Sequence, residues 1–206
     1  MQRYFITGIG TEVGKTVASA IITEALQADY WKPIQAGDLE YSDTHKVQNL
    51  ITNSKTQFHE NAYALNTPMS PHASAEIDSI EIKTENIKTP KTSNLLVVEG
   101  AGGILVPISN NETILNLINP SDKVILVSRH YLGSINHTLL SAEILKANGI
   151  HNVAILFNGE EHSTTESIIK KMAGFPILGR IDKESEITKK VVSKYAKQLE
   201  QSLKDF

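Results

Sequence analysis

The stretch GIGTEVGKT, residues 8–16, has the residue types of a phosphate-binding loop. It follows the apolar run RYFI (3–6) and precedes VASAIITEAL (17–26), which has the composition of a helix. Glycines let backbone N–H groups approach an anion, and a helix N-terminus adds partial positive charge. Lys15 is expected to reach the β- and γ-phosphates and the Thr16 hydroxyl to bind Mg²⁺. Five residues separate the first glycine from Gly-Lys-Thr, one more than usual, so we interpret the stretch as a variant loop.

Two further charged residues could act beside this loop. Lys32 stands before Pro33, which cannot donate to a sheet ladder, so the chain is expected to leave or edge the sheet there. That places Lys32 near a strand end and the phosphate loop, although its position suits an ordinary surface lysine equally well. Asp43 lies at the start of the helical pattern in 41–50, where it or Ser42 suits the N-cap. The alternative for Asp43 is a carboxylate that binds Mg²⁺.

Glu99 ends the apolar run of VVEGAGG (97–103). A carboxylate at the end of an apolar strand is where phosphate-loop NTPases place a metal-binding acid, ordinarily aspartate. Burying an ionised glutamate without a partner is costly, so a nearby cation would explain its place. The alternative is a glutamate in an exposed turn. Later in the chain, Gly133-Ser134 is typical of a helix start that can bind an anion, and Asn158-Gly159 is a turn signal whose amide could contact a base.

The elements that must position these residues alternate along the chain. Apolar runs predict strands at 3–8, 30–34, 94–100, 123–128, 152–158 and 176–179. Helical patterns occupy 16–28, 43–52, 134–148, 164–173 and 187–204. Continuous runs such as VILV indicate strands buried on both faces, so we predict a doubly wound α/β domain with a mostly parallel sheet and helices on both faces, of the P-loop NTPase type. In such sheets ligands bind at the carboxyl ends of the strands. The polar segment 54–93 interrupts the alternation, and its pattern suits either a small strand with a short helix or a partly mobile surface segment.

Composition limits the classes of protein to consider. The 206 residues suit a single domain, 1–206. A net charge of -3 argues against a protein that coats nucleic acid, because no basic excess is available to neutralise phosphates. The chain has no cysteine, which excludes disulfides and thiol nucleophiles. No apolar run approaches the length of a membrane span and no signal peptide is evident, so we expect a cytoplasmic protein without a nucleic-acid or membrane partner.

Together these pieces resemble the dethiobiotin synthetase family of the biotin pathway. That family has a phosphate loop with five residues between its glycines, usually with Thr-Glu-Val or a close variant inside, as at 11–13. The likeness covers residues 4 to about 158 and is weaker beyond. Its further signatures match, in order, KPI (32–34), SD (42–43), SPH (70–72), VEGAGG (98–103), VPI (106–108), LGSINH (132–137), FN (157–158) and PILG (176–179).

The resemblance implies a homodimeric enzyme that uses ATP and Mg²⁺. It implies that CO₂ or bicarbonate is joined to 7,8-diaminononanoate, closing the ureido ring of dethiobiotin and releasing ADP and phosphate. In the family an amine of the substrate becomes a carbamate, ATP phosphorylates the carbamate, and the second amine displaces phosphate. The carbamate is its own nucleophile, so this chemistry is compatible with the lack of an evident general base.

The resemblance also implies roles for individual residues. Lys15 would stabilise the transferring phosphoryl group, and Lys32 would neutralise the carbamate and its mixed anhydride. The implied catalytic residues are Lys32, Lys15 and Thr11, and the implied Mg²⁺ ligands are Thr16, Asp43 and Glu99. Asn158 would contact adenine, and the full set of nucleotide-binding residues is Glu12, Val13, Gly14, Lys15, Thr16, Val17, Glu99, Gly100, Ala101, Gly102 and Asn158. The substrate, whose carboxylate would bind at the helix start across the dimer interface, would contact Lys32, Ala36, Gly133, Ser134 and Asn136.

Two stretches depart from the family pattern. Ala36 stands where the family commonly has a hydroxyl residue. One substrate hydrogen bond, a contribution of about 1 kcal/mol, is then missing or comes from Gln35. GRID (179–182) lacks the proline that the family often shows near its adenine pocket.

Partition-type ATPases of the Min and Par class are the alternative, because they share the expected fold but act as dimerising switches. Their loop carries a signature lysine five residues before the phosphate lysine, and this chain has Gly10 there. Min-type relatives also end in a basic amphipathic helix that binds membrane. The segment 187–206 has a helical apolar stripe flanked by lysines, which we interpret as a packing face. The stripe consists of Ile187, Val191, Tyr195, Leu199 and Leu203.

Overall fold

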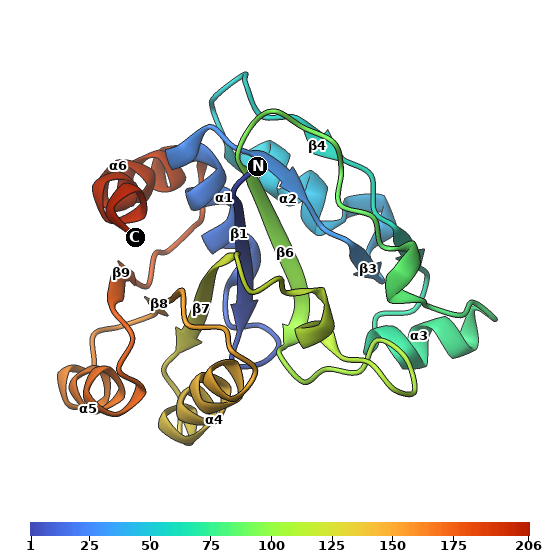
Figure 1. Ribbon diagram of the computed structural model, residues 1–206. Coiled ribbons are helices and arrows are strands. Elements are labelled where there is room, and N and C mark those ends of the chain that lie inside the picture. The colour runs from blue at the N-terminus through green and yellow to red at the C-terminus, as the bar shows by residue number, and fades with distance from the viewer.

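The computed structural model describes residues 1–206 and contains a seven-stranded sheet in which every pair of neighbouring strands is parallel (Figure 1). The strand order is β4 (Phe58–His59), β2 (Asp29–Trp31), β6 (Leu96–Gly103), β1 (Arg3–Gly8), β7 (Lys123–Arg129), β8 (Val153–Asn158) and β9 (Ile177–Ile181). A separate two-stranded sheet pairs β3 (Ile34–Ala36) with β5 (Tyr63–Leu65). The doubly wound α/β fold with a mostly parallel sheet is therefore confirmed.

Helices cover both faces of the sheet. One face carries α1 (Lys15–Leu26), which packs against α2 (Asp43–Leu50) and α6 (Lys189–Asp205), and the other carries α4 (Ser134–Ala147) packed against α5 (Ser163–Ala173) (Figure 1). The short helix α3 (Pro71–Ile77) lies beside the small sheet. Three short 3₁₀ helices complete the elements: η1 (Leu39–Tyr41), η2 (Thr84–Asn86) and η3 (Ile114–Leu117).

The central strands are buried because their apolar residues face helices on both sides. All six residues of β1 are buried, and Val124–Val127 and Val153–Phe157 form the middle of the core. After β1 the chain turns to one side of the sheet through α1 and β2, and β7 later lies on the other side of β1. The loop after β1 is therefore at the point where strand order reverses, which is where ligands bind in open α/β sheets.

The strand predicted at 30–34 is divided in the structure. β2 ends at Trp31, and Ile34 begins β3 in the other sheet. Pro33 has no N–H for a ladder, while its carbonyl accepts hydrogen bonds from the backbone N–H groups of Ala62 and Tyr63. Lys32 thus lies where the chain leaves the main sheet, as the proline indicates.

The segment 54–93 contains the expected short helix, and it has two short strands where one small strand was expected. It supplies β4 at the edge of the main sheet, β5 of the small sheet, α3 and η2. Asp29 on β2 anchors this segment, because its carboxylate accepts hydrogen bonds from Thr92 Oγ1 (2.6 Å) and from the Gln57 N–H (3.0 Å). Such long-range contacts are not visible in a local sequence pattern.

The apolar stripe of the C-terminal helix is a packing face. Tyr195, Leu199 and Leu203 are buried where α6 packs against α1, β9 and α2. Ile187 and Val191 of the expected stripe are only half-buried, and Val192 and Ala196 are buried instead. In no helix is the apolar run long enough for a bilayer crossing.

Candidate active site

The loop between β1 and α1 has two positions at which the structure leaves no room for a Cβ atom, so glycine is needed at both. Gly14, the N-cap of α1, has φ +97°, and a Cβ added to it would lie 2.2 Å from Nδ2 of Asn158. A Cβ on Gly8 would lie 2.5 Å from Cγ2 of Val13. The backbone is thus packed tightly against its neighbours. Because the first N–H groups of an α-helix have no partner within the helix, the start of α1 can bind phosphate.

Side chains from two adjacent strands hold consecutive carbonyl groups of this loop. Arg129 and Asn158 are register partners at the ends of β7 and β8. Arg129 Nη1 donates to the Glu12 carbonyl (3.0 Å), and Asn158 Nδ2 donates to the Val13 carbonyl (2.9 Å). In a trans peptide group the C=O and N–H point in opposite directions. Fixing these two carbonyls therefore directs the following N–H groups, those of Val13 and Gly14, away from the two strands.

The sequence predicts a role for Asn158 but none for Arg129. The amide nitrogen of Asn158 is engaged with the phosphate loop, so its contact with adenine stays a prediction. The residue whose carbonyl Arg129 holds, Glu12, has an uncommon backbone conformation for a non-glycine residue, with φ +58°. The signal that could have found Arg129 is its place at the carboxyl end of the buried strand β7, where ligands bind in such sheets.

Lys15 is buried beneath the loop. Its ammonium donates to the Gly10 carbonyl (2.9 Å), and its side chain lies near Glu99 and Lys32. Burial lowers the pKa of Lys15 from its ordinary value to about 8, although the negative charge of Glu99 opposes the shift. Gly10, which stands where the partition ATPases carry their signature lysine, thus contributes a carbonyl that orients the phosphate lysine.

The pKa of Lys15 predicts how nucleotide affinity depends on pH. Below about pH 8 the amine is protonated and can pair with phosphate, whereas above that value the protein binds nucleotide only by taking up a proton. We expect the association constant for ADP to fall as pH rises from about 8, by up to about tenfold per pH unit. Isothermal titration calorimetry from about pH 7 to about pH 10 measures this slope.

The matched control is Lys15→Arg, because a guanidinium keeps its charge over this range. Its affinity for ADP should be independent of pH between the same limits, whatever its absolute value. An equal slope in both proteins would assign the titration to another group.

Lys32, Asp43 and Glu99 form an ionic cluster in which Lys32 and Glu99 are buried and Asp43 is half-buried. Lys32 is 5% exposed, so it is not an ordinary surface lysine. Its ammonium donates to Oδ2 of Asp43 and to Oε1 of Glu99 (3.1 Å). Burial lowers the pKa of Lys32, but the two carboxylates outweigh burial and raise it above its ordinary value. Lys32 is therefore held as a cation beside the phosphate loop.

Asp43 is free for this pairing because Ser42 serves as the N-cap of α2, in a capping box with His45. Burial raises the pKa of Asp43, but Lys32 and then Lys46 lower it below its ordinary range. Lys46 Nζ lies 3.2 Å from Oδ1, so the two carboxylate oxygens face different lysines. Asp43 is thus ionised, and of the two possible caps only Ser42 acts as one.

Glu99 is completely buried, so the alternative of an exposed turn is wrong. Thr16 Oγ1 donates to its Oε1 (2.9 Å), which also accepts from Lys32. Tyr30 donates its phenol hydrogen to the other oxygen, Oε2 (2.9 Å). The threonine of the phosphate loop and Glu99, which ends the apolar part of β6, are therefore brought together, as the sequence predicts.

The oxygen donors of this cluster fit Mg²⁺. Thr16 and Glu99 are in direct contact, and Asp43 is joined to Glu99 through Lys32. Hard oxygen ligands are those that Mg²⁺ prefers, and it usually keeps waters and substrate phosphates as its other ligands. No group of three or more His, Cys, Asp or Glu side chains is placed to hold a metal ion by itself, so the structure has no separate all-protein metal cage.

The glycines after Glu99 allow close contact between β6 and the loop. A Cβ on Gly102, which has φ +69°, would lie 2.8 Å from Val106 Cγ2 and 3.6 Å from Oγ1 of Thr11. A Cβ on Gly100 would press on Phe5 and Ile114 at 3.2 Å. Thr11 is exposed on the rim of the loop, and Ala101 is half-buried between these glycines. The predicted phosphate-loop and β6 residues thus share one edge of the sheet.

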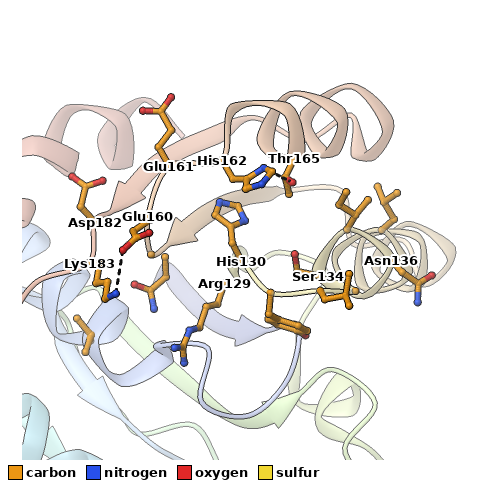
Figure 2. Close-up of a pocket in the computed structure, with 18 of the residues that line it drawn as sticks. Arg129, His130, Ser134, Asn136, Glu160, Glu161, His162, Thr165, Asp182 and Lys183 are labelled. Atoms are coloured by element: carbon orange, nitrogen blue, oxygen red, sulfur yellow. Dashed lines mark hydrogen bonds and ion pairs between the residues drawn. The ribbon is translucent and has the colours of Figure 1, made fainter.

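A cleft of about 1240 Å³ extends from the first turn of α1 and the ends of β7 and β8 to the start of α4, and neither residues 8–16 nor Lys32, Asp43 and Glu99 line it. Val17 and Asn158 line it near the loop, and Gly133, Ser134 and Asn136 line it at the start of α4. Figure 2 shows Ser134 and Asn136 on that helix, with Lys183 and Glu160 paired at the opposite end of the cleft, 3.1 Å apart. The helix start predicted at Gly133 is confirmed, since Gly133 is the N-cap of α4 with φ +102°.

Ala36 lies apart from this cleft. It is half-buried on β3, where it pairs with Leu65. Gln35 beside it donates to the Gly37 carbonyl (2.9 Å) and accepts from the Asp43 N–H (3.4 Å). Gln35 therefore positions the start of α2, and its amide is engaged with backbone groups.

The fold and this site define a P-loop ATPase. The solved MinD cell division ATPase of Pyrococcus furiosus has a TM-score of 0.61 at 11% identity and is matched over 100% of this chain and 99% of its own. The MinC:MinD complex of Aquifex aeolicus gives 0.59 at 14% identity, over 100% and 96%. A family model described as an AAA domain matches residues 2–191. At these identities the structural likeness establishes the fold alone.

Sequence relatives identify the family within this class. The ATP-dependent dethiobiotin synthetase BioD of Christiangramia forsetii is 60% identical over 202 residues, or 98% of each chain. The protein of the same name from Cytophaga hutchinsonii is 48% identical over 97% of each chain. The chain belongs to the ATP-dependent dethiobiotin synthetase family. The resemblance drawn from its motifs is thereby confirmed, and the partition-ATPase alternative is limited to a shared fold.

Proposed function

We propose that this chain joins CO₂ to 7,8-diaminononanoate and closes the ring of dethiobiotin, at a site formed by the phosphate loop and the cluster of Lys32, Asp43 and Glu99. The chain is an ATP-dependent ligase by family membership. The observation that carries the proposed site is the second buried ammonium. A phosphate loop needs Lys15 for ATP, whereas Lys32 supplies a cation beside it for an anionic acceptor of the phosphoryl group.

Negative charge develops on both reactants, and the residues present oppose it. Lys15 and the N–H groups at the start of α1 bind the phosphates of ATP, and Lys32 holds the carbamate oxygens. Thr16, Asp43 and Glu99 would hold Mg²⁺, which when bound neutralises phosphate oxygens during transfer. Thr11, Glu12, Val13, Val17 and the backbone of Gly100–Gly102 would border the nucleotide. Burial of the cluster strengthens each of these electrostatic interactions by excluding water.

The decisive test is whether phosphate release depends on the diamine. The protein is incubated with MgATP, bicarbonate and 7,8-diaminononanoate, and both inorganic phosphate and the mass of the product are followed. We expect phosphate and dethiobiotin in equal amounts, and no phosphate when the diamine is omitted. ATP hydrolysis at the same rate with and without the diamine would contradict the proposal.

We propose that two chains associate through the start of α4, where the substrate carboxylate would bind. Tyr131, Leu132 and Ile135 are exposed around the N-cap Gly133, and Leu132 is fully exposed. Exposed apolar side chains gathered at one place mark interaction surfaces. A partner lying there would cover these side chains and close one side of the cleft.

The cytoplasm, which supplies ATP, is the proposed location, and the chain is proposed to act as one domain over 1–206.

Leu132→Asp should dissociate this dimer, because it places a charge in the centre of the proposed apolar contact. Light scattering coupled to size-exclusion chromatography should show the monomer mass, and the KM for the diamine should rise by roughly tenfold or more. Ile77→Asp is the control, since Ile77 is an exposed isoleucine (59%) on α3. A Leu132→Asp protein that kept the mass of a dimer would place the contact elsewhere.

A further inference from the structure

We propose that Tyr30 is a positioning residue that fixes the orientation of the Glu99 carboxylate toward Thr16 and the nucleotide-bound cation. The inference rests on the proposed function, since it concerns the same site. Tyr30 lies on β2 and belongs to none of the motifs that indicate nucleotide or substrate binding. The contact is made between strands rather than within a motif.

The register of the sheet brings the two side chains together. Tyr30 pairs with Val97 of the parallel strand β6, and Glu99 follows two residues later on the same face of the sheet. A tyrosine side chain is long enough to reach this diagonal neighbour. Its hydroxyl lies 2.9 Å from Oε2 of Glu99, and both residues are completely buried. The contact is therefore shielded from water.

The donors to Glu99 are distributed unequally between its two oxygens. Thr16 and Lys32 both donate to Oε1, whereas Tyr30 alone donates to Oε2. Without the phenol, Oε2 would be a buried carboxylate oxygen with no hydrogen-bond donor, which is costly. The carboxyl group would then be expected to rotate so that both oxygens share the remaining donors. Such a rotation would move the oxygen that faces Thr16.

A glutamate needs this constraint more than an aspartate would. Its additional methylene adds one rotatable bond, so its carboxylate can occupy more positions. The Tyr30 ring is itself held by Phe58 of β4, at a centroid distance of 5.9 Å and a tilt of 53°. Burial, and then the charges of Glu99 and Asp43, raise the pKa of Tyr30 well above its ordinary value, so the phenol remains a donor. Tyr30 is thus a rigid donor to a flexible acid.

The test is Tyr30→Phe, which removes the hydroxyl and keeps the ring. The probe is Mn²⁺ added to the ADP complex, with the bound ion measured by electron paramagnetic resonance. We expect the Kd for Mn²⁺ to rise by about tenfold, the lower end of the effect of outer-shell partners on metal affinity. In turnover assays kcat at low Mg²⁺ should fall and be largely restored at high Mg²⁺, while the KM for the diamine stays unchanged.

Tyr4→Phe is the matched control. Tyr4 is a buried tyrosine (2% exposed) on the main sheet, but its hydroxyl donates to the Leu203 carbonyl (3.2 Å), on α6 and away from Glu99. Its substitution loses the same atom and should leave the Kd for Mn²⁺ unchanged. A purely structural effect of a lost buried hydroxyl would appear as a lower unfolding temperature in both variants, without the change in metal affinity.

Tyr30→Phe combined with Glu99→Gln provides a second measurement. If Tyr30 acts through Glu99, the double variant should bind Mn²⁺ as weakly as Glu99→Gln alone. An unchanged Kd in Tyr30→Phe, or independent effects that add in the double variant, would overturn the inference. These outcomes do not depend on the diamine, so a loss of Mn²⁺ affinity in a protein whose ATP hydrolysis ignores the diamine would support the inference and contradict the proposed function.

Discussion

Replacing Lys32 by alanine is expected to lower dethiobiotin synthesis by about 10³-fold while the affinity for ADP stays close to that of the unsubstituted protein. The rate effect follows from removing a charge placed where negative charge develops. Nucleotide affinity should be kept because Lys15 and the phosphate loop are unchanged. Synthesis is measured as diamine-dependent phosphate release, and ADP binding by isothermal titration calorimetry.

The local structure indicates that this variant can fold. Asp43 would keep its contact with Lys46, and Glu99 would keep those with Thr16 and Tyr30, so neither carboxylate loses every donor. Breaking a buried ion pair typically costs about 3–5 kcal/mol, so a lower unfolding temperature is expected. Activity is therefore compared at a temperature where circular dichroism shows both proteins folded.

Lys46→Ala is the matched control for Lys32→Ala. Lys46 pairs with the other oxygen of Asp43, and its side chain is 34% exposed. The substitution therefore also removes a lysine that pairs with Asp43, but one on the solvent side of the cluster. The turnover of Lys46→Ala should stay close to that of the unsubstituted protein, because an exposed ion pair contributes little. If Lys32→Ala instead lost ADP affinity in proportion to turnover, Lys32 would be a nucleotide ligand rather than the partner of the carbamate.

Glu99→Gln should reduce turnover by a similar factor, about 10³-fold, for a different reason. The amide has almost the same shape, so packing is kept, but it removes the negative charge that a divalent cation requires. An amide also donates hydrogens, and its NH₂ group would face donors such as Tyr30 or Lys32. Weak activity that rises with Mg²⁺ concentration, together with weak Mn²⁺ binding to the ADP complex, is the expected result.

Glu24→Gln provides the control for this substitution. The Glu24 carboxylate also accepts several hydrogen bonds, from Thr52 and Asn53, but these tie α1 to the loop after α2. The change can lower the unfolding temperature, whereas Mn²⁺ affinity should be unaffected. Normal Mn²⁺ binding in Glu99→Gln would show that Glu99 is a structural acid, and the metal site would then have to be sought at other residues.

Arg129 and Asn158 illustrate how a phosphate loop can be held from outside its own sequence motif. Each donates to one loop carbonyl, and the two lie side by side because β7 and β8 are adjacent and parallel. The loop is therefore positioned by the same sheet edge that borders the cleft. Arg129 and Asn158 thus contact the phosphate loop and also line the cleft that reaches the start of α4.

The sequence alone determined the elements whose patterns are local. Buried strands such as β7 and β8 contain continuous apolar runs, and the order of the strands with the intervening helices specifies a doubly wound sheet. The phosphate loop was predictable because it directly follows a short apolar strand, and Glu99 because it ends the apolar run of β6. Family membership followed from several motifs in one order, and the relatives confirm it.

Tertiary structure decided the contacts between elements. Whether Lys32 is exposed or buried depends on where α2 and β6 lie, and only their packing places its ammonium between Asp43 and Glu99. Tyr30 reaches Glu99 because of strand register, which a local pattern does not encode. Hydrogen bonds of this kind join residues far apart in the chain, so their partners are set by the assembled sheet, whereas a helix or a buried strand is set by the periodicity of its own residues.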